Sequence, residues 1–205
     1  MPPTRDSTTD ARPRPRRADA ERSVARIEDA AIDALASDPE VSMAAIARRA
    51  GVVRATIYVH FPTREALIEA VTDRAIAEAT QAMAAAEPER GDAADALRRV
   101  LAAAWRALGR FHALVAINTR LPATELRRRH EALLAVLQPL IERGQRDGTF
   151  RSAVPPGWHL SMILALVHAA SAELRSGRAP EAEAEEAVIA TVLGAICEPR
   201  VPAGE

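Results

Sequence analysis

The sequence predicts an all-α protein of about nine helices, and three observations support this prediction. Apolar residues make up 48% of the 205 residues and aromatic residues only 3%, so the apolar share is mostly Ala, Leu, Val and Ile, and Ala and Leu are strong helix formers. Apolar side chains recur at helical spacing along the chain. Gly and Pro separate these periodic segments, and no segment shows the alternation typical of a strand.

The first part of the chain contains four predicted helices. Ser42 and Thr63 are good N-caps, and Asp38-Pro39 ends the helix that comes before them. Gly51 supplies a tight turn between two short helices. The expected helices are residues 19–37 with Asp19 as the cap, 43–50, 54–60 and 63–86.

Beyond a connector at residues 87–91, every periodic segment is again helical. Gly109, Pro122, Gly148 and Gly177 interrupt the pattern, since glycine and proline are the strongest local breakers of regular structure. The expected helices are residues 92–108, 110–121, 123–146, 155–176 and 181–198.

Several classes of protein do not fit this sequence. The single cysteine, Cys197, excludes an intrachain disulfide and a thiolate zinc site and suits a reducing cytosol. Residues 1–17 lack the apolar core of a secretory signal, and no stretch reaches the roughly 20 apolar residues of a membrane span. No metal-ligand spacing or Gly-rich phosphate loop is present. We therefore expect a cytoplasmic protein that is not an enzyme, with no catalytic residues, metal or cofactor.

Charge is unevenly placed along the chain. The formal net charge is −1, so nucleic-acid binding would need a local basic patch. Residues 41–64 contain four arginines, Arg48, Arg49, Arg54 and Arg64, and no acidic residue. Release of counterions from phosphates would favour such a segment on DNA, although a solvated helix face would explain the same charges.

The spacing of the motifs favours DNA. Two short helices joined by a turn with Gly51 describe a helix-turn-helix, in which the second helix enters the major groove. The segment 41–71, VSMAAIARRAGVVRATIYVHFPTREALIEAV, resembles the DNA-binding segment of TetR-family transcriptional regulators. The matching pieces are Ile46-Ala47, Ala50-Gly51-Val52, Thr56-Ile57-Tyr58, His60-Phe61 and Thr63 to Leu67.

The resemblance implies which side chains contact DNA. Arg54 and Ala55 open the third helix and should approach base edges, where Arg54 can pair with guanine. Val59 can touch a thymine methyl group, and His60 is either a DNA contact or a satisfied core residue. The expected DNA-binding set is Ser42, Arg54, Ala55, Thr56, Tyr58, Val59, His60 and Arg64.

One residue departs from the family pattern. Val53 stands where members usually carry Ser or Thr, whose hydroxyl would cap the recognition helix and bind a phosphate. Valine caps poorly, at a cost of about 1 kcal/mol. We therefore expect one DNA contact fewer and a less ordered recognition helix in the absence of DNA.

The C-terminal half holds most of the apolar mass, and the resemblance implies that it encloses a small-molecule cavity and forms a homodimer. Such cavities are mostly apolar with a few polar groups; for each candidate, plain core packing is the alternative. The candidate ligand-binding residues are Trp105, Phe111, His112, Asn118, Leu137, Trp158 and Met162, with Leu114, Leu133, His159 and His168 as further candidates.

Small residues on the last two predicted helices would allow close packing of two subunits. The expected dimer interface contains Ala165, Ala169, Ala172, Ala187, Ala190 and Gly194. A C2 dimer also suits DNA recognition, because two recognition helices one DNA turn apart read a palindrome.

The sequence thus predicts a regulator, most simply a repressor, which a small-molecule effector releases from a palindromic double-stranded operator. The alternatives are a helical dimeric adaptor, or a regulator that needs a corepressor before it binds an operator. The expected division is 1–17, a disordered Pro/Arg-rich arm; 18–64, the DNA-binding domain; 65–90, a linking helix and connector; 91–198, the ligand-binding and dimerisation domain; and 199–205, a disordered tail. The arm either reaches DNA, as flexible arms do elsewhere, or binds nothing.

Overall fold

The computed structural model describes residues 15–117, 122–178 and 180–199. In these residues the regular structure is helical apart from one isolated β-bridge between Phe150 and Cys197, which confirms the all-α class. The elements are α1 (Pro15–Ser37), α2 (Met43–Arg49), α3 (Arg54–His60), α4 (Arg64–Ala85), α5 (Ala93–Leu108), the 3₁₀ turn η1 (Gly109–Phe111), α6 (His112–Ile117), α7 (Ala123–Arg129), α8 (Glu131–Arg146), α9 (Pro156–Arg175) and α10 (Glu181–Ile196).

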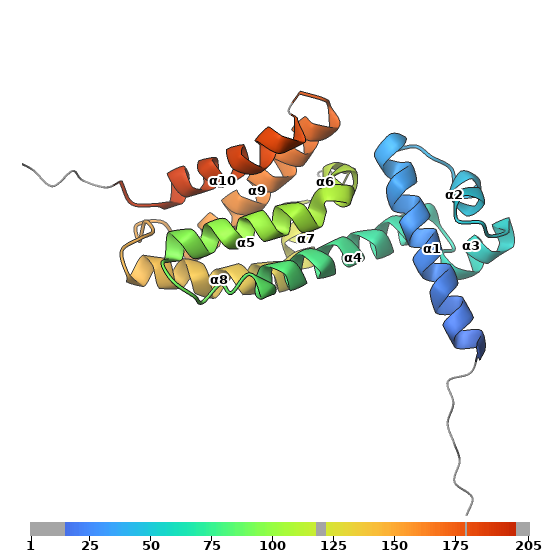
Figure 1. Ribbon diagram of the computed structural model, residues 1–205, viewed down its shortest axis with the longest axis horizontal. Helices are drawn as coiled ribbons and strands as arrows, with labels where there is room; N and C mark the ends of the chain where they lie inside the picture. The colour runs from blue at the N-terminus through green and yellow to red at the C-terminus, as the bar shows by residue number, and fades with distance from the viewer. Residues whose placement is uncertain (1–14, 118–121, 179, 200–205) are drawn as a thin grey trace, which may run out of the picture.

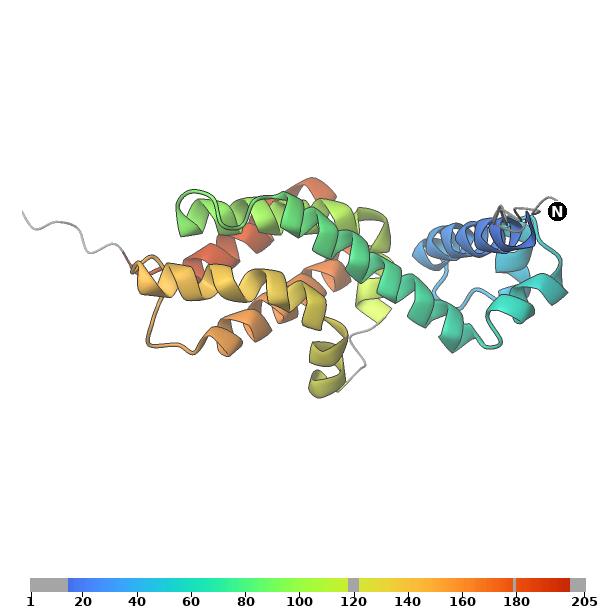
Figure 2. The same ribbon diagram turned by 90° about the horizontal axis from the view of Figure 1, so that it is seen from below.

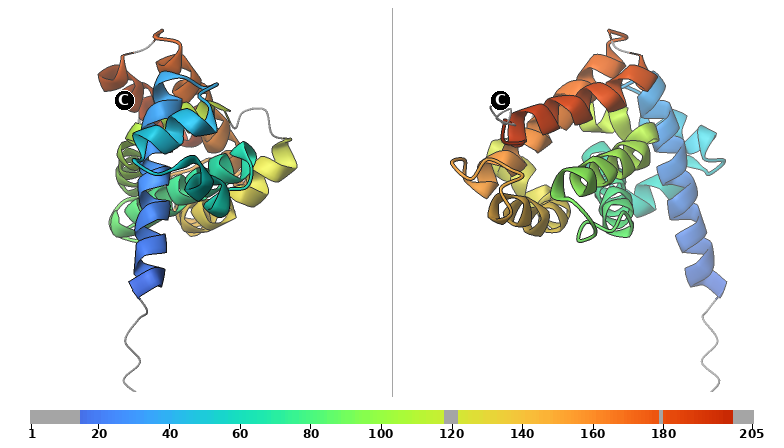
Figure 3. Two further views of the ribbon diagram at one scale, coloured as in Figure 1. Left: turned by 90° about the vertical axis from the view of Figure 1, so that its right-hand side faces the viewer. Right: turned by 60° about the vertical axis from the view of Figure 1, so that its left-hand side comes forward.

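The molecule has two parts joined by one long helix. Helices α1, α2 and α3 form a small unit at one end, and α5 to α10 form a bundle at the other (Figure 1). Helix α4 belongs to both parts: it starts directly after α3 and runs into the bundle beside α5 and α8, as Figure 2 shows. The left view of Figure 3, turned by 90° from Figure 1, shows α1 lying across the end of the bundle.

Two hydrophobic clusters form the cores of these two parts. The first centres on Ile27, Ile57 and Leu67 and extends to Phe111 and Leu114 of η1 and α6. The small N-terminal unit therefore packs directly on the beginning of α6 and is not merely tethered by α4. The second cluster lies among α4, α5, α8, α9 and α10.

Three helices differ from the expected bounds. Helix α1 begins at Pro15, so residues 15–17 are helical where the disordered arm was expected, because proline is tolerated in the first turn of a helix. Asp19 therefore lies inside α1 and does not cap it. The expected helix 123–146 is divided at His130, which is the C-cap of α7 and the N-cap of α8. The expected helix 110–121 is described only as η1 and α6, and residues 118–121 lie outside the described chain.

The other expected bounds agree with the structure to within two residues where the chain is described. Residues 1–14 of the predicted arm and 200–205 of the predicted tail lie outside the described residues. No helix in the described ranges combines the length and apolar character needed to cross a membrane.

Gly144 of α8 provides a test of the packing in the bundle. The fully buried ring of Phe150 lies where a Cβ on Gly144 would stand. Gly to Ala in a helix interior normally adds about 1 kcal/mol of stability, but overpacking costs about 1–3 kcal/mol. We predict that Gly144→Ala lowers the free energy of unfolding measured by urea denaturation.

Gly157→Ala on α9 is the matched control, since a Cβ there meets its nearest atom, of Arg127, at 3.8 Å. It should be neutral or stabilising. A Gly144→Ala protein at least as stable as the wild type would contradict the packing of Phe150 on α8.

Candidate functional site

The connection between α2 and α3 is a tight turn. Gly51 has a φ of +64°, a left-handed conformation that glycine adopts without steric cost. The amide of Val52 donates to the carbonyl of Ala47 at 3.0 Å. Four residues, Ala50 to Val53, thus separate the helices, which is the length of turn that a helix-turn-helix uses.

Arg26 of α1 fixes this turn. Its Nη2 donates to the carbonyls of Ala50 at 2.5 Å and Gly51 at 3.0 Å. The backbone conformation of Gly51 calls for glycine, and a Cβ on Gly51 would meet that nitrogen at 2.7 Å, so a larger residue would also displace the end of the Arg26 side chain. Sequence reasoning missed Arg26, because no local pattern links it to a turn more than twenty residues away.

The outward face of α3 carries side chains that were predicted to contact DNA. Ile57 is fully buried and anchors the helix. On the opposite face Val59 is 77% and Tyr58 38% exposed, and Arg54 and Ala55 are also exposed. The Arg54 guanidinium carbon lies 5.6 Å from the centre of the Tyr58 ring, a distance at which cation and ring attract each other.

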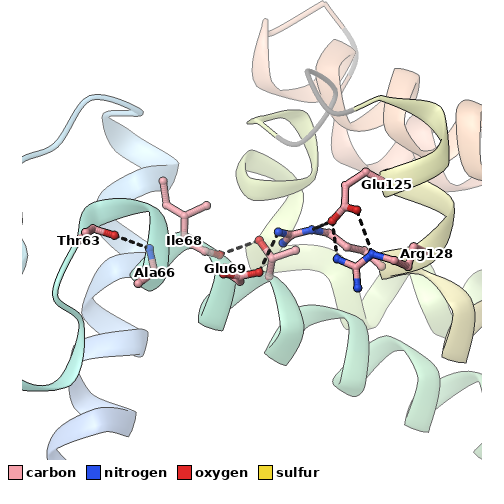
Figure 4. Close-up of polar contacts among 8 residues, drawn as sticks. Thr63, Ala66, Ile68, Glu69, Glu125 and Arg128 are labelled. Carbon is pink, nitrogen blue, oxygen red and sulfur yellow. Dashed lines mark hydrogen bonds and ion pairs between the residues drawn. The ribbon is translucent and has the colours of Figure 1, made fainter.

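The caps of α2 and α4 agree with the sequence analysis. The Ser42 hydroxyl accepts a hydrogen bond from the Ala45 amide at 3.3 Å, and the Thr63 hydroxyl accepts one from the Ala66 amide at 3.1 Å (Figure 4). Val53 is the N-cap of α3 and makes no side-chain cap bond, which confirms that this residue caps the recognition helix poorly.

The other predicted contact residues lie at the edge of this face. Thr56, His60 and Arg64 are half-buried. The Arg64 Nη2 donates to the carbonyl of Pro39 and so ties the start of α4 to the loop before α2. A guanidinium has five N–H donors, which leaves capacity for a phosphate. Together with the exposed Arg48 and Arg49, these side chains give the unit a positive surface.

A narrow apolar cavity lies inside the bundle. Helices α4, α5, α6, α8, α9 and α10 all contribute to its walls, and its volume is about 60 Å³. One water molecule requires about 10–15 Å³, and pockets for drug-sized ligands are on the order of 300–1,000 Å³. An organic ligand could therefore enter only if the walls moved apart.

Only some of the predicted ligand-binding residues line this cavity in the structure. Trp105 and Leu137 line the cavity, together with the further candidates Leu114, Leu133 and His168. Asn118 lies outside the described residues.

Other members of that set lie elsewhere. Trp158 is 70% exposed in the first turn of α9, because the helical period turns it outward while its neighbour His159 is buried. Phe111 packs in the first hydrophobic cluster, and the His112 ring contacts Ser171 at 3.0 Å. Met162 packs against the second cluster without lining the cavity.

Two histidines that face each other belong to the polar part of the cavity wall. The His130 and His168 rings lie 5.4 Å apart in an edge-to-face arrangement. Burial, helped by the nearby His130, lowers the pKa of His168 to about 4. Burial also lowers the pKa of His130, so both rings are neutral at pH 7. Sequence reasoning missed His130, which follows a run of arginines and has no apolar pattern around it.

A network of ion pairs connects this wall to α4. Arg129, next to His130, contacts Glu69 of α4 at 2.9 Å and Glu125 of α7 at 3.2 Å. Arg128 also pairs with Glu125 (Figure 4), and the hydrogen bonds from the two arginines lower the pKa of Glu125 to about 2. The cavity wall is thus held to the first turns of α4.

A second group of ion pairs joins α4 to α1. Arg74 of α4 contacts Glu28 at 3.3 Å and Asp29 at 3.1 Å. Arg110 of η1 contacts the same Asp29 at 3.1 Å. The pairs are partly exposed, so each contributes little to stability, but they set the position of α1 relative to α4.

The small residues predicted for the dimer interface lie mostly on the surface of α9 and α10. Ala165, Ala169, Ala187, Ala190 and Gly194 are exposed, and Ala172 is half-buried. The opposite face of α10 is buried through Val188 and Val192. The two helices therefore present a row of small side chains outward; its contact with a second subunit stays a prediction.

The comparisons with known proteins agree with this geometry. Residues 29–71 match the family described as bacterial regulatory proteins of the tetR family, and the match covers the end of α1, the helix-turn-helix and the start of α4. No curated protein sequence matches the chain.

The fold resembles solved regulators over most of its length. The TetR-like regulator LfrR from Mycobacterium smegmatis, in complex with proflavine, is 25% identical, with a TM-score of 0.64 over 87% of this chain and 98% of that one. A TetR regulatory protein from Mycobacterium vanbaalenii is 28% identical, with a TM-score of 0.56 over 90% and 100%. FadR from Bacillus subtilis, in complex with stearoyl-CoA, is 18% identical, with a TM-score of 0.68 over 82% and 97%, and shares the fold alone.

The low pKa of His168 predicts a pH dependence of stability. Between the ordinary value of 6.5 and the folded value of about 4, the unfolded chain binds the proton and the folded chain does not. The contribution of the neutral His168 to the free energy of unfolding is therefore fully present above pH 6.5, and it is lost as the pH drops through this window. From pH 7 to pH 5 this one group should cost about 2 kcal/mol.

Urea denaturation of the wild type and His168→Gln at pH 7 and pH 5 measures this cost. The wild type should lose more stability than the variant by about that amount. Equal losses would show that His168 is not buried as a neutral ring.

Proposed function

We propose that this chain, a transcriptional regulator of the tetR family, binds a palindromic operator as a homodimer and leaves it when a small molecule enters the bundle. The observation that carries the proposal is the exposed face of α3, where Arg54, Tyr58 and Val59 stand beside a glycine turn in a segment free of acidic residues. A repressor is the simplest form of this mechanism, and it would act in the cytoplasm, where the DNA lies.

Different side chains would have different roles on DNA. Arg54, in the first turn of α3, would read a guanine through two hydrogen bonds. Tyr58 and Thr56 would donate hydroxyl hydrogen bonds to phosphates, and Val59 would contact a thymine methyl group. Arg48, Arg49 and Arg64 would bind the backbone and make the affinity fall with salt.

The homodimer would form through α9 and α10. The exposed small side chains of these helices allow two backbones to approach closely, and a symmetric pair places two copies of α3 on one face of the DNA. A dimer is needed because a single helix of seven residues contacts too few base pairs to select one site in a genome.

The effector would act by opening the cavity. Because the cavity holds only a few water molecules, a ligand must displace its walls. The wall at His130 is joined through Arg129 to Glu69 of α4, and α4 carries the helix-turn-helix. A ligand that binds the open form better shifts the population toward it. Proflavine in LfrR and stearoyl-CoA in FadR are ligands of similarly folded proteins.

Selection of binding sites from a random DNA pool tests DNA recognition. We predict that the wild type enriches an inverted repeat. Arg54→Ala should weaken binding to it by about 1–3 kcal/mol and relax the preference at one base pair per half-site. Tyr58→Ala should weaken binding without changing the preferred sequence. Neither change should unfold the protein, since both side chains are exposed.

Arg90→Ala, which removes an exposed arginine from the connector between α4 and α5, is the control. Unchanged affinity in both variants would refute the placement of α3 in the groove. If no sequence is enriched, operator binding without a ligand is refuted, and the alternatives are a regulator that needs a corepressor and a helical adaptor.

A further inference from the structure

The described side chains that line the cavity are mostly apolar, and none of them is cationic. Among the described residues, neither arginine nor any other cationic group lines it, and most of the wall is aliphatic. Its polar members are Thr72, Trp105, His130, His168 and Glu185. Which ligand the cavity can accept depends on whether these groups donate or accept hydrogen bonds.

While their rings are neutral, the two histidines can only accept a further hydrogen bond. The Nδ1 of His130 lies 2.8 Å from the carbonyl of Leu126, and the Nδ1 of His168 lies 3.2 Å from the carbonyl of Val115. A carbonyl accepts but never donates, so Nδ1 carries the proton in both rings. In a neutral imidazole the other nitrogen then holds a lone pair. Neither Nε2 has a hydrogen-bond partner among the described residues, so two acceptors remain available.

Glu185 adds a negative charge to the wall. It lies three and four residues before Val188 and Ile189, so all three share one face of α10, and all three line the cavity. The side chain is half-buried, and no described arginine forms an ion pair with it. A carboxylate at the edge of an apolar cavity gains from a cation that enters beside it, because the attraction is stronger where water is excluded.

Taking the effector role proposed above as given, we propose that the ligand is a lipophilic organic cation bearing an amine or another N–H donor. Its charge pairs with Glu185, and its N–H groups donate to Nε2 of His130 or His168. Its apolar body packs on the aliphatic wall and on the ring of Trp105, whose face attracts cations. The indole N–H of Trp105 is a neutral donor and does not balance an anion.

The same wall disfavours an acid. A fatty-acid carboxylate or a phosphate would enter beside Glu185 with no arginine among the described wall residues to pair with it, and the two histidines could compensate it only by binding protons that their burial disfavours; burying an unpaired charge is costly. The stearoyl-CoA complex of FadR is therefore a poor guide to this cavity, although the fold is shared.

Two probes with the same tail and opposite charge test this inference. We would titrate decylammonium and decanoate at pH 7 into the full-length Trp158→Phe protein, in which Trp105 is the one tryptophan left, and follow its fluorescence without DNA. Decylammonium should bind at least about tenfold more tightly. Glu185→Gln should remove most of that preference.

The exposed neighbour Glu186 provides the control. Glu186→Gln should keep the preference, because its side chain points away from the cavity wall. Equal or tighter binding of decanoate, or a preference that survives Glu185→Gln, would overturn the proposal.

Operator binding, measured separately, distinguishes this failure from failure of the proposed function. If the wild-type protein binds its selected site and decanoate releases it, the proposed function stands and the proposed ligand class is overturned. Binding of decylammonium that depends on Glu185 supports the ligand class even if no operator is found.

Discussion

The position of α4 is the constraint on which the rest of the structure depends. This one helix packs in both hydrophobic clusters, begins at the Thr63 cap next to α3, and forms a wall of the cavity. Arg64 and Arg74 tie it to the DNA-binding unit, and Glu69 ties it to α7. A displacement of α4 would be passed on to α3, since only three residues, Phe61 to Thr63, lie between the two helices.

The small size of the cavity indicates how a ligand could displace α4. Because about 60 Å³ is too little for an organic molecule, an effector of the proposed kind would have to move the walls of the cavity apart. Such an effector would displace packed side chains, and the ion pair between Arg129 and Glu69 would carry the displacement to α4. Partly exposed ion pairs are individually weak, so they can rearrange at small cost while the apolar contacts keep both parts folded.

The sequence predicted the helix-turn-helix better than the cavity, for a physical reason. Caps, glycine turns and helical periodicity act over a few residues, so Ser42, Gly51, Val53 and Thr63 could be interpreted locally. The cavity depends on six helices meeting, and no local pattern reveals which way a residue such as Trp158 turns. Arg26 and Arg129 act through contacts between distant segments. Glu185 could have been found, because its spacing from Val188 and Ile189 places it on the buried face of its helix.

The most direct test of this coupling is the distance between the two recognition helices of the proposed dimer. A spin label at Val59→Cys in a Cys197→Ala background, measured by double electron–electron resonance, reports that distance without relying on DNA. Without ligand the two labels should lie near one DNA turn apart, about 34–36 Å, and saturating decylammonium should shift the distribution away from this value. A distribution that stays unchanged on saturation would contradict the role of α4 as the link between cavity and DNA.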